Sequence, residues 1–344
     1  MRRKRSMQVQ PGRTDLWWQN IKMGIAPESE WRNNFRVNRE DFYFLLEKVK
    51  RYVKEPLTKV RKDVITFDKK LAMTLYYLKD QGSFRMIANS FGCHKASVSL
   101  AIKEICGVIS KNLGPELIQF PESKEDVQKA TAGFLNRFGF PQVIGCIDGT
   151  HIPIKQPSEN AHDYYSYKMK HTINVQAICN HLGQFIDLEI KWPGSVHDAR
   201  MFANSGVQKS YLEGKFKFFY ENLSDKPETQ KMVPQILLGD PAYPLLPYCM
   251  REYESCTSNL QVLFNQMLRS ARNQIECAFG RLKARWRILL RAVDLKLDRV
   301  PSVIHTCFIL HNFCERRKIE ISREEVEEVI IRERRENKTT SDKI

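Results

Sequence analysis

Two short apolar runs that each end in an aspartate constrain the fold of this chain more than any other feature. Val143–Ile147 leads to Asp148 in VIGCIDGT, and Gln235–Leu238 leads to Asp240 in QILLGD. Short apolar runs bounded by turn-forming residues are typical of buried strands. If the two strands are neighbours, both carboxylates reach the same rim of a sheet. The pattern therefore predicts an α/β domain with an acidic site, and a strand that ends at Asp148 in a glycine turn.

A carboxylate at the end of a buried strand is costly unless its charge is compensated. A metal ion is one compensation, and a hydrogen-bonded turn or helix cap is the other. The Asp148-Gly149 pair alone favours a turn, whereas further acids in similar settings favour a metal. Asp198, in WPGSVHDARMF, is such an acid, and the stretch leaves open whether it caps a helix or faces a metal.

A long amphipathic helix is predicted from about Asn265 to Leu290. Its apolar stripe must face the core, and its other face is basic around a single acid, Glu276. Glu276 either pairs with Arg272 at i−4 or is a metal ligand whose neighbours hold phosphate. Gly280 costs a helix about 1 kcal/mol relative to Ala, which indicates close approach by another element. The stripe consists of Ile275, Phe279, Leu282, Trp286 and Leu289, and the basic residues expected to hold DNA are Arg269, Arg272, Lys283 and Arg287.

Residues 68–113 predict a helix followed by a compact helical pair. Ser83 is a helix cap, Gly92 breaks the second helix, and a third helix follows. The spacing suits a helix-turn-helix that reads a major groove, although a purely structural pair is the open alternative. The residues expected to face outward from the third helix are His94, Lys95, Ser97, Ser99 and Lys103.

The composition favours a polyanionic partner. The formal net charge is +15 at pH 7, and each Lys or Arg that neutralises a phosphate releases counterions. The nine cysteines form no CxxC pair and mostly lie in apolar runs, so we expect reduced core residues of an intracellular protein. No apolar run approaches the roughly 20 residues of a membrane helix, and Met1–Arg13 is too polar for a secretory signal. We therefore expect a soluble protein without a membrane partner; the opening MRRKR is a nuclear-import signal, a phosphate-gripping arm or a solvated terminus.

Three further segments leave alternatives open. Thr172–Cys179 and Phe185–Ile190 are β-rich runs expected to pair as a hairpin. The preceding YYSYKMK suits either stacking on unpaired bases or an amphipathic sheet edge. Residues 300–315 contain His305, Cys307, His311 and Cys314, but the spacing matches no standard zinc module, which favours structural core.

Six ordered motifs resemble those of the PIF/Harbinger transposases and the Harbinger transposase-derived nucleases of vertebrates. They span roughly residues 31–316 and read GCIDGTHI, HTINVQAICN, WPGSVHDARMF, LLGDPAYPL, RNQIECAFGRLKARWRIL and CFILHNF. The resemblance implies a ribonuclease-H-like DDE core preceded by a helical DNA-binding region. It places the catalytic triad on Asp148, Asp240 and Glu276, and a further acid on Asp198. Pro241 departs from the small residue expected after the second aspartate.

Such a site implies divalent-metal chemistry on DNA. Carboxylates suit Mg²⁺ or Mn²⁺, and two such ions about 4 Å apart activate a water and stabilise the leaving oxygen of a phosphodiester. We expect Asp148 to bridge the ions, with Asp240 and Glu276 each completing one and Asp198 assisting. A water nucleophile gives DNA cleavage by an endonuclease, and a DNA 3′-OH gives strand transfer by a transposase.

Two other functions stay open. One is a domesticated DNA-binding protein that has kept the fold and no longer cuts, and the other is action on RNA. The resemblance implies a separate Myb-like DNA-binding partner; a homo-oligomer is also possible, and the expected localisation is the nucleus. The predicted domains are a basic N-terminal arm (1–30), a helical region (31–120) with the helix-turn-helix at about 68–113, a nuclease domain (141–316) and a charged C-terminal tail (317–344).

Overall fold

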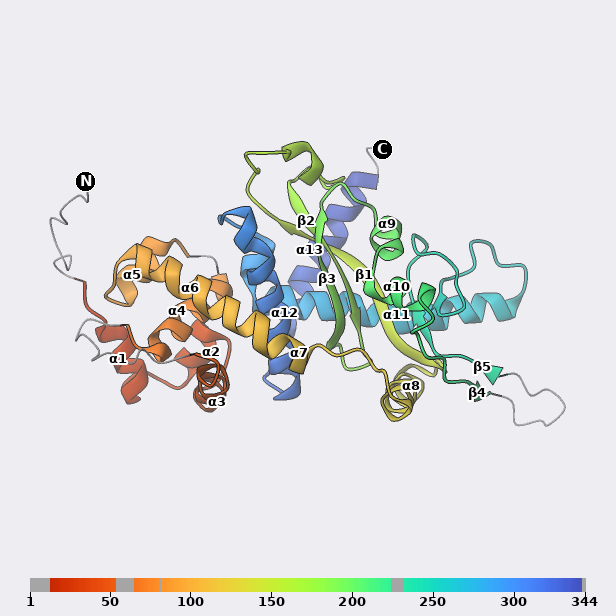
Figure 1. The fold of residues 1–344 in the computed structure, drawn as a ribbon, viewed down its shortest axis with the longest axis horizontal. Coiled ribbons are helices and arrows are strands. Elements are labelled where there is room, and N and C mark those ends of the chain that lie inside the picture. The colour runs from red at the N-terminus through yellow and green to blue at the C-terminus, as the bar shows by residue number, and fades with distance from the viewer. Residues whose placement is uncertain (1–12, 54–64, 81, 224–231, 342–344) are drawn as a thin grey trace.

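The computed structural model describes residues 13–53, 65–80, 82–223 and 232–341 (Figure 1). The basic MRRKR segment lies outside the described residues. Helices α1 to α6 lie to one side of a mixed sheet, and the long helix α11 runs past the sheet (Figure 1). The mixed α/β class expected from the two apolar runs is confirmed, with a sheet compatible with a DDE nuclease core.

The central sheet has five strands in the order β3-β2-β1-β6-β7. Strand β1 (Val143–Pro153) pairs antiparallel with β2 (Thr172–Cys179) and parallel with β6 (Ile236–Leu238). The predicted hairpin of β2 and β3 (Phe185–Pro193) is confirmed. Its turn contains Gly183 at a φ of 77°, a backbone conformation that favours glycine. The two aspartate-bearing strands are therefore neighbours, as predicted.

The prediction that the first strand ends at Asp148 is wrong. Strand β1 continues to Pro153 because its pairing with β2 extends beyond the glycine, with Asp148 opposite Ala177 and Thr150 opposite Val175. Pairing with β6 stops at Cys146. Asp148 thus lies in mid-strand, at the point where β6 leaves β1, and the rim is made by the end of β6.

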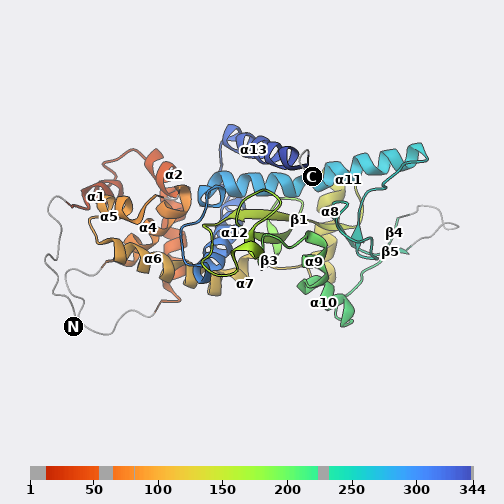
Figure 2. The same ribbon diagram turned by 90° about the horizontal axis from the view of Figure 1, so that it is seen from above.

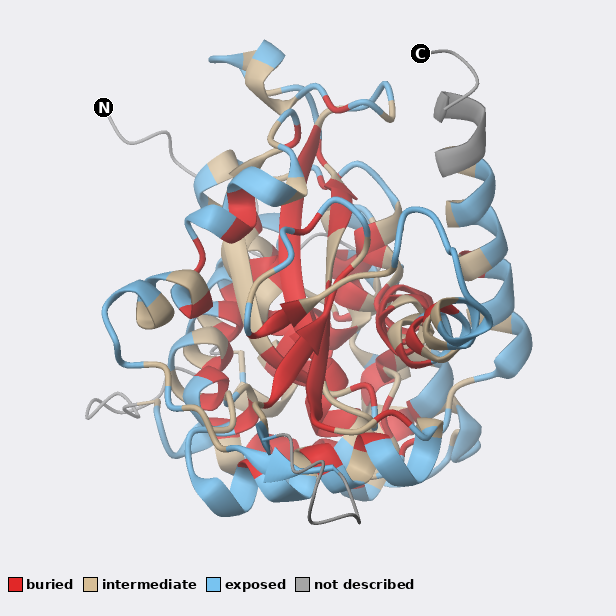
Figure 3. Ribbon diagram, turned by 90° about the vertical axis from the view of Figure 1, so that its right-hand side faces the viewer, coloured by how far each residue is buried: buried red, intermediate tan, exposed pale blue. Residues whose placement is uncertain are grey.

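Alternate residues of β1 face two different layers of helices. Cys146 belongs to the cluster that contains Phe279 of α11, whereas Ile147 belongs to the cluster that contains Phe202 of α9. Helices α11 and α12 therefore cover one face, and α9 and α10 cover the other (Figure 2). The buried strands form the middle of the molecule when it is viewed from its end (Figure 3). The bounds of these helices are α9 Asp198–Ala203, α10 Gly206–Leu212, α11 Asn259–Arg285 and α12 Val300–Arg316.

The predicted apolar stripe of the long helix is buried at every position. The helix itself differs from the prediction at both ends. Ser258 caps α11 through a hydrogen bond from the Gln261 amide, and the helix ends at Arg285 because Trp286 leaves helical backbone angles. A short 3-10 helix, η4 (Arg287–Leu290), follows. Arg287 is therefore not on α11.

The N-terminal helices pack around an aromatic core. Trp18, Trp31, Phe35 and Phe42 are all buried, and their rings lie 5.0–5.9 Å apart in edge-on or tilted pairs. Trp18 lies on α1, so the segment predicted as a basic N-terminal arm (1–30) contains a helix whose apolar side chains complete the core.

Helices α4, α5 and α6 occupy the segment predicted to hold a helical pair. The Ser83 cap is confirmed, since its Oγ accepts a hydrogen bond from the Met86 amide at 3.2 Å. Gly92 has a φ of 59° in the turn before α6. Thr306 of α12 donates a hydrogen bond to the Cys106 carbonyl at 3.2 Å, which ties α6 to the core. The role of this pair in reading DNA and the predicted domain boundaries stay predictions.

The C-terminal segment forms a helix, α13 (Arg323–Ser341), that packs along α11. Val329 is buried, and Ile330 lies directly above Gly280. The charged sequence of residues 322–344 predicts a solvated helix with a frayed end; the helix is present, but it is not wholly solvated, because its apolar stripe meets the glycine. The close approach predicted at Gly280 is thereby identified.

Within the described ranges, no helix has the length and apolar character needed to span a membrane. The remaining elements are α1 Leu16–Met23, α2 Ser29–Phe35, α3 Arg39–Lys50, α4 Phe67–Asp80, α5 Phe84–Ser90, α6 Lys95–Val108, the π-helical η1 Ile109–Leu113, α7 Gly114–Leu117, α8 Lys124–Phe138, η2 Ala161–Tyr164, β4 Glu221–Asn222, β5 Met232–Val233, β7 Cys249–Met250 and η5 Leu297–Arg299.

Candidate active site

Asp148 and Asp240 face each other across the end of the parallel pair β1 and β6. The Gly149 amide donates a hydrogen bond to Asp148 Oδ1 at 2.8 Å, and the Ala242 amide donates to Asp240 Oδ1 at 3.0 Å. Burial, reinforced by the neighbouring Asp240 carboxylate, raises the pKa of Asp148 to about 8. Burial also raises the pKa of Asp240. Burial thus disfavours the charged form of both carboxylates, and a bound cation would stabilise that form.

Asp198 approaches the same point from the other face of the sheet. It is the first residue of α9, and His197 occupies the cap position, so the interpretation of Asp198 as an N-cap is wrong. Its Oδ1 accepts a hydrogen bond from the side-chain amide of Asn174 at 3.1 Å. Gly149 makes room for it, because a Cβ there would lie 2.5 Å from Asp198 Oδ1. Burial raises the pKa of Asp198 despite this hydrogen bond.

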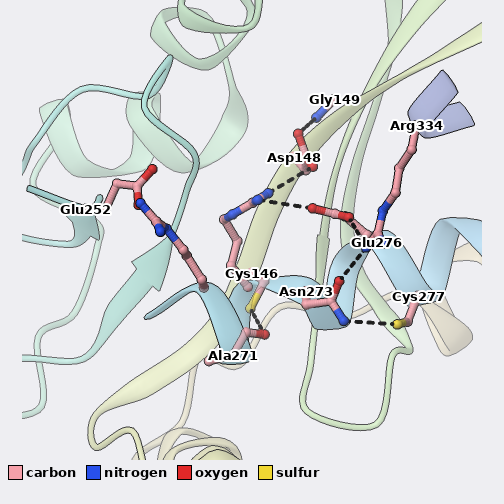
Figure 4. A network of polar contacts seen from close by, with 11 residues as sticks. Cys146, Asp148, Gly149, Glu252, Ala271, Asn273, Glu276, Cys277 and Arg334 are labelled. Carbon is pink, nitrogen blue, oxygen red and sulfur yellow. Dashed lines mark hydrogen bonds and ion pairs between the residues drawn. The ribbon is translucent and has the colours of Figure 1, made fainter. Parts of the chain in front are cut away.

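Glu276, on α11, forms ion pairs with two arginines, which occupy the carboxylate oxygens that a metal would need (Figure 4). Arg272 donates to Glu276 Oε1 at 3.0 Å, which is the predicted i−4 pair, and its other terminal nitrogen lies 3.6 Å from Asp148 Oδ2. Arg334, which reaches down from α13, donates to Glu276 Oε2 at 3.0 Å. The guanidinium groups thus balance the acids in this arrangement.

The carboxylate oxygens suit a hard cation, but the acids do not form a complete metal site in this arrangement. Across the part of the chain that the structure describes, no three His, Cys, Asp or Glu side chains form a group that could hold a metal ion. Two buried amide oxygens on β2, those of Asn174 and Gln176, lack hydrogen-bond partners among the described residues. Asp148, Asp198 and Asp240 are the residues that could hold an ion, whereas Glu276 would have to exchange its arginine partners first.

Lys283 lies one and a half to two turns beyond Glu276 and is only 1% exposed. Its ammonium donates to Thr150 Oγ1 at 2.7 Å and forms an ion pair with Glu333 of α13. In this structure Lys283 is therefore not accessible to DNA, and its contact with DNA stays a prediction. Next to it, burial and nearby lysines lower the pKa of His151 to about 3, so this imidazole is neutral.

The other residues predicted to hold DNA are spread over two regions. Lys95 and Lys103 are exposed on α6, and Ser97 is half-buried there. Ser99 is half-buried and accepts a hydrogen bond from Arg299 at 3.2 Å, so it faces η5 and not open solvent. Arg269 is exposed and pairs with Glu252 (Figure 4), while Arg287 is half-buried in η4.

Of two alternatives left open by the sequence, burial decides that of the zinc site, and that of YYSYKMK stays open. His311 is fully buried, and its Nε2 makes a 2.9 Å hydrogen bond with the Gly183 carbonyl. His305 instead contacts Ser110, 2.6 Å away, so this helix contributes core residues and not a zinc site. In YYSYKMK, the Tyr167 ring packs edge-on against His151 with centroids 5.1 Å apart, yet the side chain stays 46% exposed.

Comparison with known proteins supports the resemblance found in the motifs. Residues 147–312 match the model described as DDE superfamily endonuclease. This segment contains all four acids. The match and the names of the relatives agree with the Harbinger-derived DDE proteins expected from the motifs.

Relatives of the whole chain carry different names. The chain is 25% identical over 310 residues to the Arabidopsis thaliana protein "Antagonist of like heterochromatin protein 1", covering 86% of this chain and 76% of the relative. It is 23% identical over 304 residues to the Homo sapiens protein "Putative nuclease HARBI1", covering 88% and 82%. It is 22% identical over 177 residues to a Microchaete diplosiphon protein named as a transposase for insertion sequence IS702, covering 51% and 60%. No solved structure gives a significant match.

Several residues around the DDE site were not singled out from the sequence. Arg334 and Glu333 come from the segment predicted to be a solvated tail, and Asn174 lies in the middle of a predicted strand. The sequence of α13 does contain a pattern typical of a packed helix. Val326, Val329 and Ile330 fall at i, i+3 and i+4 before Glu333. This stripe indicates a packed helix, but it does not indicate the surface on which the helix packs.

Proposed function

We propose that this chain is a divalent-metal-dependent DNA endonuclease of the transposase type. In this proposal Asp148, Asp240 and Glu276 are the catalytic acids, and Asp198 is a further metal ligand. The observation that carries it is that Asp148, Asp198 and Asp240 lie close enough, where pairing of β1 with β6 ends, for Asp240 and Asp198 to raise the pKa of Asp148 in addition to burial. Two bound Mg²⁺ or Mn²⁺ ions would supply positive charge and an activated water or DNA 3′-OH at this point.

The chain's own residues have three tasks in this proposal. Arg272 lies within 3.6 Å of both Asp148 and Glu276, so it stabilises these acids while no cation is bound. When the acids bind a cation, Arg272 becomes free to hold a phosphate. Three further cations on and after α11 position the DNA backbone and carry no sequence information. They are Arg269, Lys283 and Arg287.

Sequence reading is assigned in this proposal to the helical region. Helix α6 presents Lys95 and Lys103 to solvent, with Ser97 between them, and these side chains suit contact with a major groove. A Myb-like DNA-binding partner, a homo-oligomer and a nuclear localisation complete the proposal. They rest on the resemblance and on the basic composition.

A second candidate is a DNA-binding protein that no longer cuts. One observation favours it: Glu276 is paired with both Arg272 and Arg334, so the third acid is neutralised without a metal. One relative is also named as an antagonist and not as a nuclease.

Nicking of supercoiled plasmid separates the two candidates. The nuclease proposal expects nicked circles with Mg²⁺ or Mn²⁺, none with EDTA, and none with Asp148→Asn. Glu159→Gln, an exposed acid outside the site, is the matched control and should nick normally. Equal nicking by Asp148→Asn would contradict the assigned acids. Absence of metal-dependent nicking by the wild type, both alone and with a Myb-like partner, would favour the second candidate.

A further inference from the structure

Helix α13 covers a strip of three lysines beside the DDE acids. The strip comprises Lys168 and Lys170, from the segment before β2, and Lys283 of α11. Lys283 is buried and paired with Glu333, and Lys170 lies 3.0 Å from Glu336. Lys168 lines a small cavity together with Lys170, Glu333 and Glu336. The two glutamates of α13 thus lie on the lysine strip.

Arg334, between these glutamates in sequence, contacts other residues of α11 and none of the three lysines. It reaches Glu276 at 3.0 Å and Asn273 at 3.2 Å (Figure 4). A single turn of α13 therefore places negative charge on the lysines and positive charge on an acid. This is the charge pattern that a DNA phosphate and its associated cations would bring to the same surface.

The apolar stripe of α13 is short. Val326 and Ile330 lie over Gly280 of α11, Val329 is buried, and Glu325 forms an ion pair with Arg36 at 3.3 Å. Arg334 is 58% exposed at its side chain, and Glu333 is 26% exposed. The pairs Arg334–Glu276 and Lys170–Glu336 are partly exposed and contribute little to stability. The buried Lys283 ammonium, in contrast, requires an anion beside it. A polyanion that offers several phosphates can replace the exposed pairs and supply that anion.

We propose that the strip formed by Lys168, Lys170 and Lys283 is a DNA phosphate-binding surface, and that α13 is a displaceable cover whose Glu333 and Glu336 occupy the phosphate positions. Arg334 occupies the position of a cation at Glu276. The identity of the ligand as DNA rests on the proposed function. Displacement of α13 frees the lysines and one of the two arginine contacts of Glu276 in the same movement.

DNA affinity in EDTA tests the cover without requiring cleavage. The test variant is Glu333→Gln/Glu336→Gln in the full chain, which keeps the apolar contacts of α13. The control is Glu327→Gln/Glu328→Gln, which removes the same charge from exposed positions of the same helix. Measured with a labelled duplex at low salt, the test pair should bind roughly five- to fifty-fold tighter than the wild type, and the control less than about two-fold tighter. Circular dichroism checks that both variants keep their helix content.

Equal affinity changes in the two pairs, whether both are zero or both are large, would overturn the proposal. A second measurement is amide hydrogen exchange over residues 323–336 with and without the duplex. Exchange should become faster when DNA binds, and unchanged or slower exchange would overturn the displacement. If the wild type fails to nick plasmid while the test pair still binds DNA more tightly than the control, the nuclease proposal fails and the covered phosphate surface stands.

Discussion

At the scale of single residues, one glycine shapes the acidic site. Gly149 lies between Asp148 on its own strand and Asp198 on α9, and its lack of a side chain lets the Asp198 carboxylate approach the backbone of β1. The same glycine donates its amide to Asp148. The position therefore serves two carboxylates that come from opposite faces of the sheet.

Gly149→Ala should displace Asp198 and impair the site. The added Cβ would lie 2.5 Å from Asp198 Oδ1 and 2.8 Å from its Cγ, and overpacking of this kind costs about 1–3 kcal/mol. We expect lower stability in urea unfolding and loss of metal-dependent nicking. Gly107→Ala, on α6, is the matched control because nothing lies within 4 Å of its added Cβ. Normal nicking by Gly149→Ala would show that the position of Asp198 is unimportant.

Asp187 gives a prediction about how the free energy of unfolding depends on pH. Burial and the Glu189 carboxylate raise the pKa of Asp187 to about 6, from 3.8 in the unfolded chain. The folded state therefore bears the cost of the charged form above about pH 6 and not below about pH 4. Asp187→Asn should raise the free energy of unfolding by about 1–3 kcal/mol at pH 7.5 and by much less at pH 4.5.

Urea unfolding at the two pH values checks this difference. Glu159→Gln, which changes an exposed acid, should show no comparable change in its effect between the two. If Asp187→Asn has the same effect at both pH values, the carboxylate is not destabilised by burial.

At the scale of elements, the sequence predicts local structure better than long-range docking. The strand pair, the hairpin and the stripe of α11 follow from periodicity, which is written in consecutive residues. The length of β1 does not, because pairing with β2 carries the strand through Gly149. The pairing of Arg334 with Glu276 is also beyond a local pattern, since an amphipathic helix can dock on any matching surface.

Gly280→Ala should loosen α13 without damaging α11. The added Cβ would lie 2.7 Å from Ile330 Cγ1, while Ala favours a helix by about 1 kcal/mol over Gly. Amide exchange over residues 323–336 should become faster by about ten-fold or more, with α11 still protected. Combining Gly280→Ala with Ile330→Ala restores space and should reverse part of the effect. Unchanged exchange in the single variant would contradict the observed packing of α13.

At the scale of the whole molecule, two regions are expected to act on one DNA. The helical region is tied to the core by the contact of Thr306 with the Cys106 carbonyl and by that of Ser110 with His305. The lysines exposed on α6 and the DDE acids therefore belong to one packed unit. Contacts to phosphate from α6 should add to those near the acids.

Lys103→Ala should reduce the salt dependence of DNA binding. Each lost phosphate contact lowers the magnitude of the slope of log K against log salt by about 1. Lys103→Arg keeps the charge and should leave the slope nearly unchanged. The measurement is duplex affinity at several salt concentrations, and an unaltered slope for Lys103→Ala would place α6 away from the DNA backbone.

The central claim is that Asp148, Asp240 and Glu276, assisted by Asp198, bind divalent cations for DNA cleavage. Anomalous diffraction from crystals grown with Mn²⁺ and a short duplex tests it most directly. The account predicts Mn²⁺ peaks among these carboxylates, with Arg272 moved from its position between Asp148 and Glu276. A structure with DNA bound, no Mn²⁺ at the acids and both arginines still paired with Glu276 would contradict it.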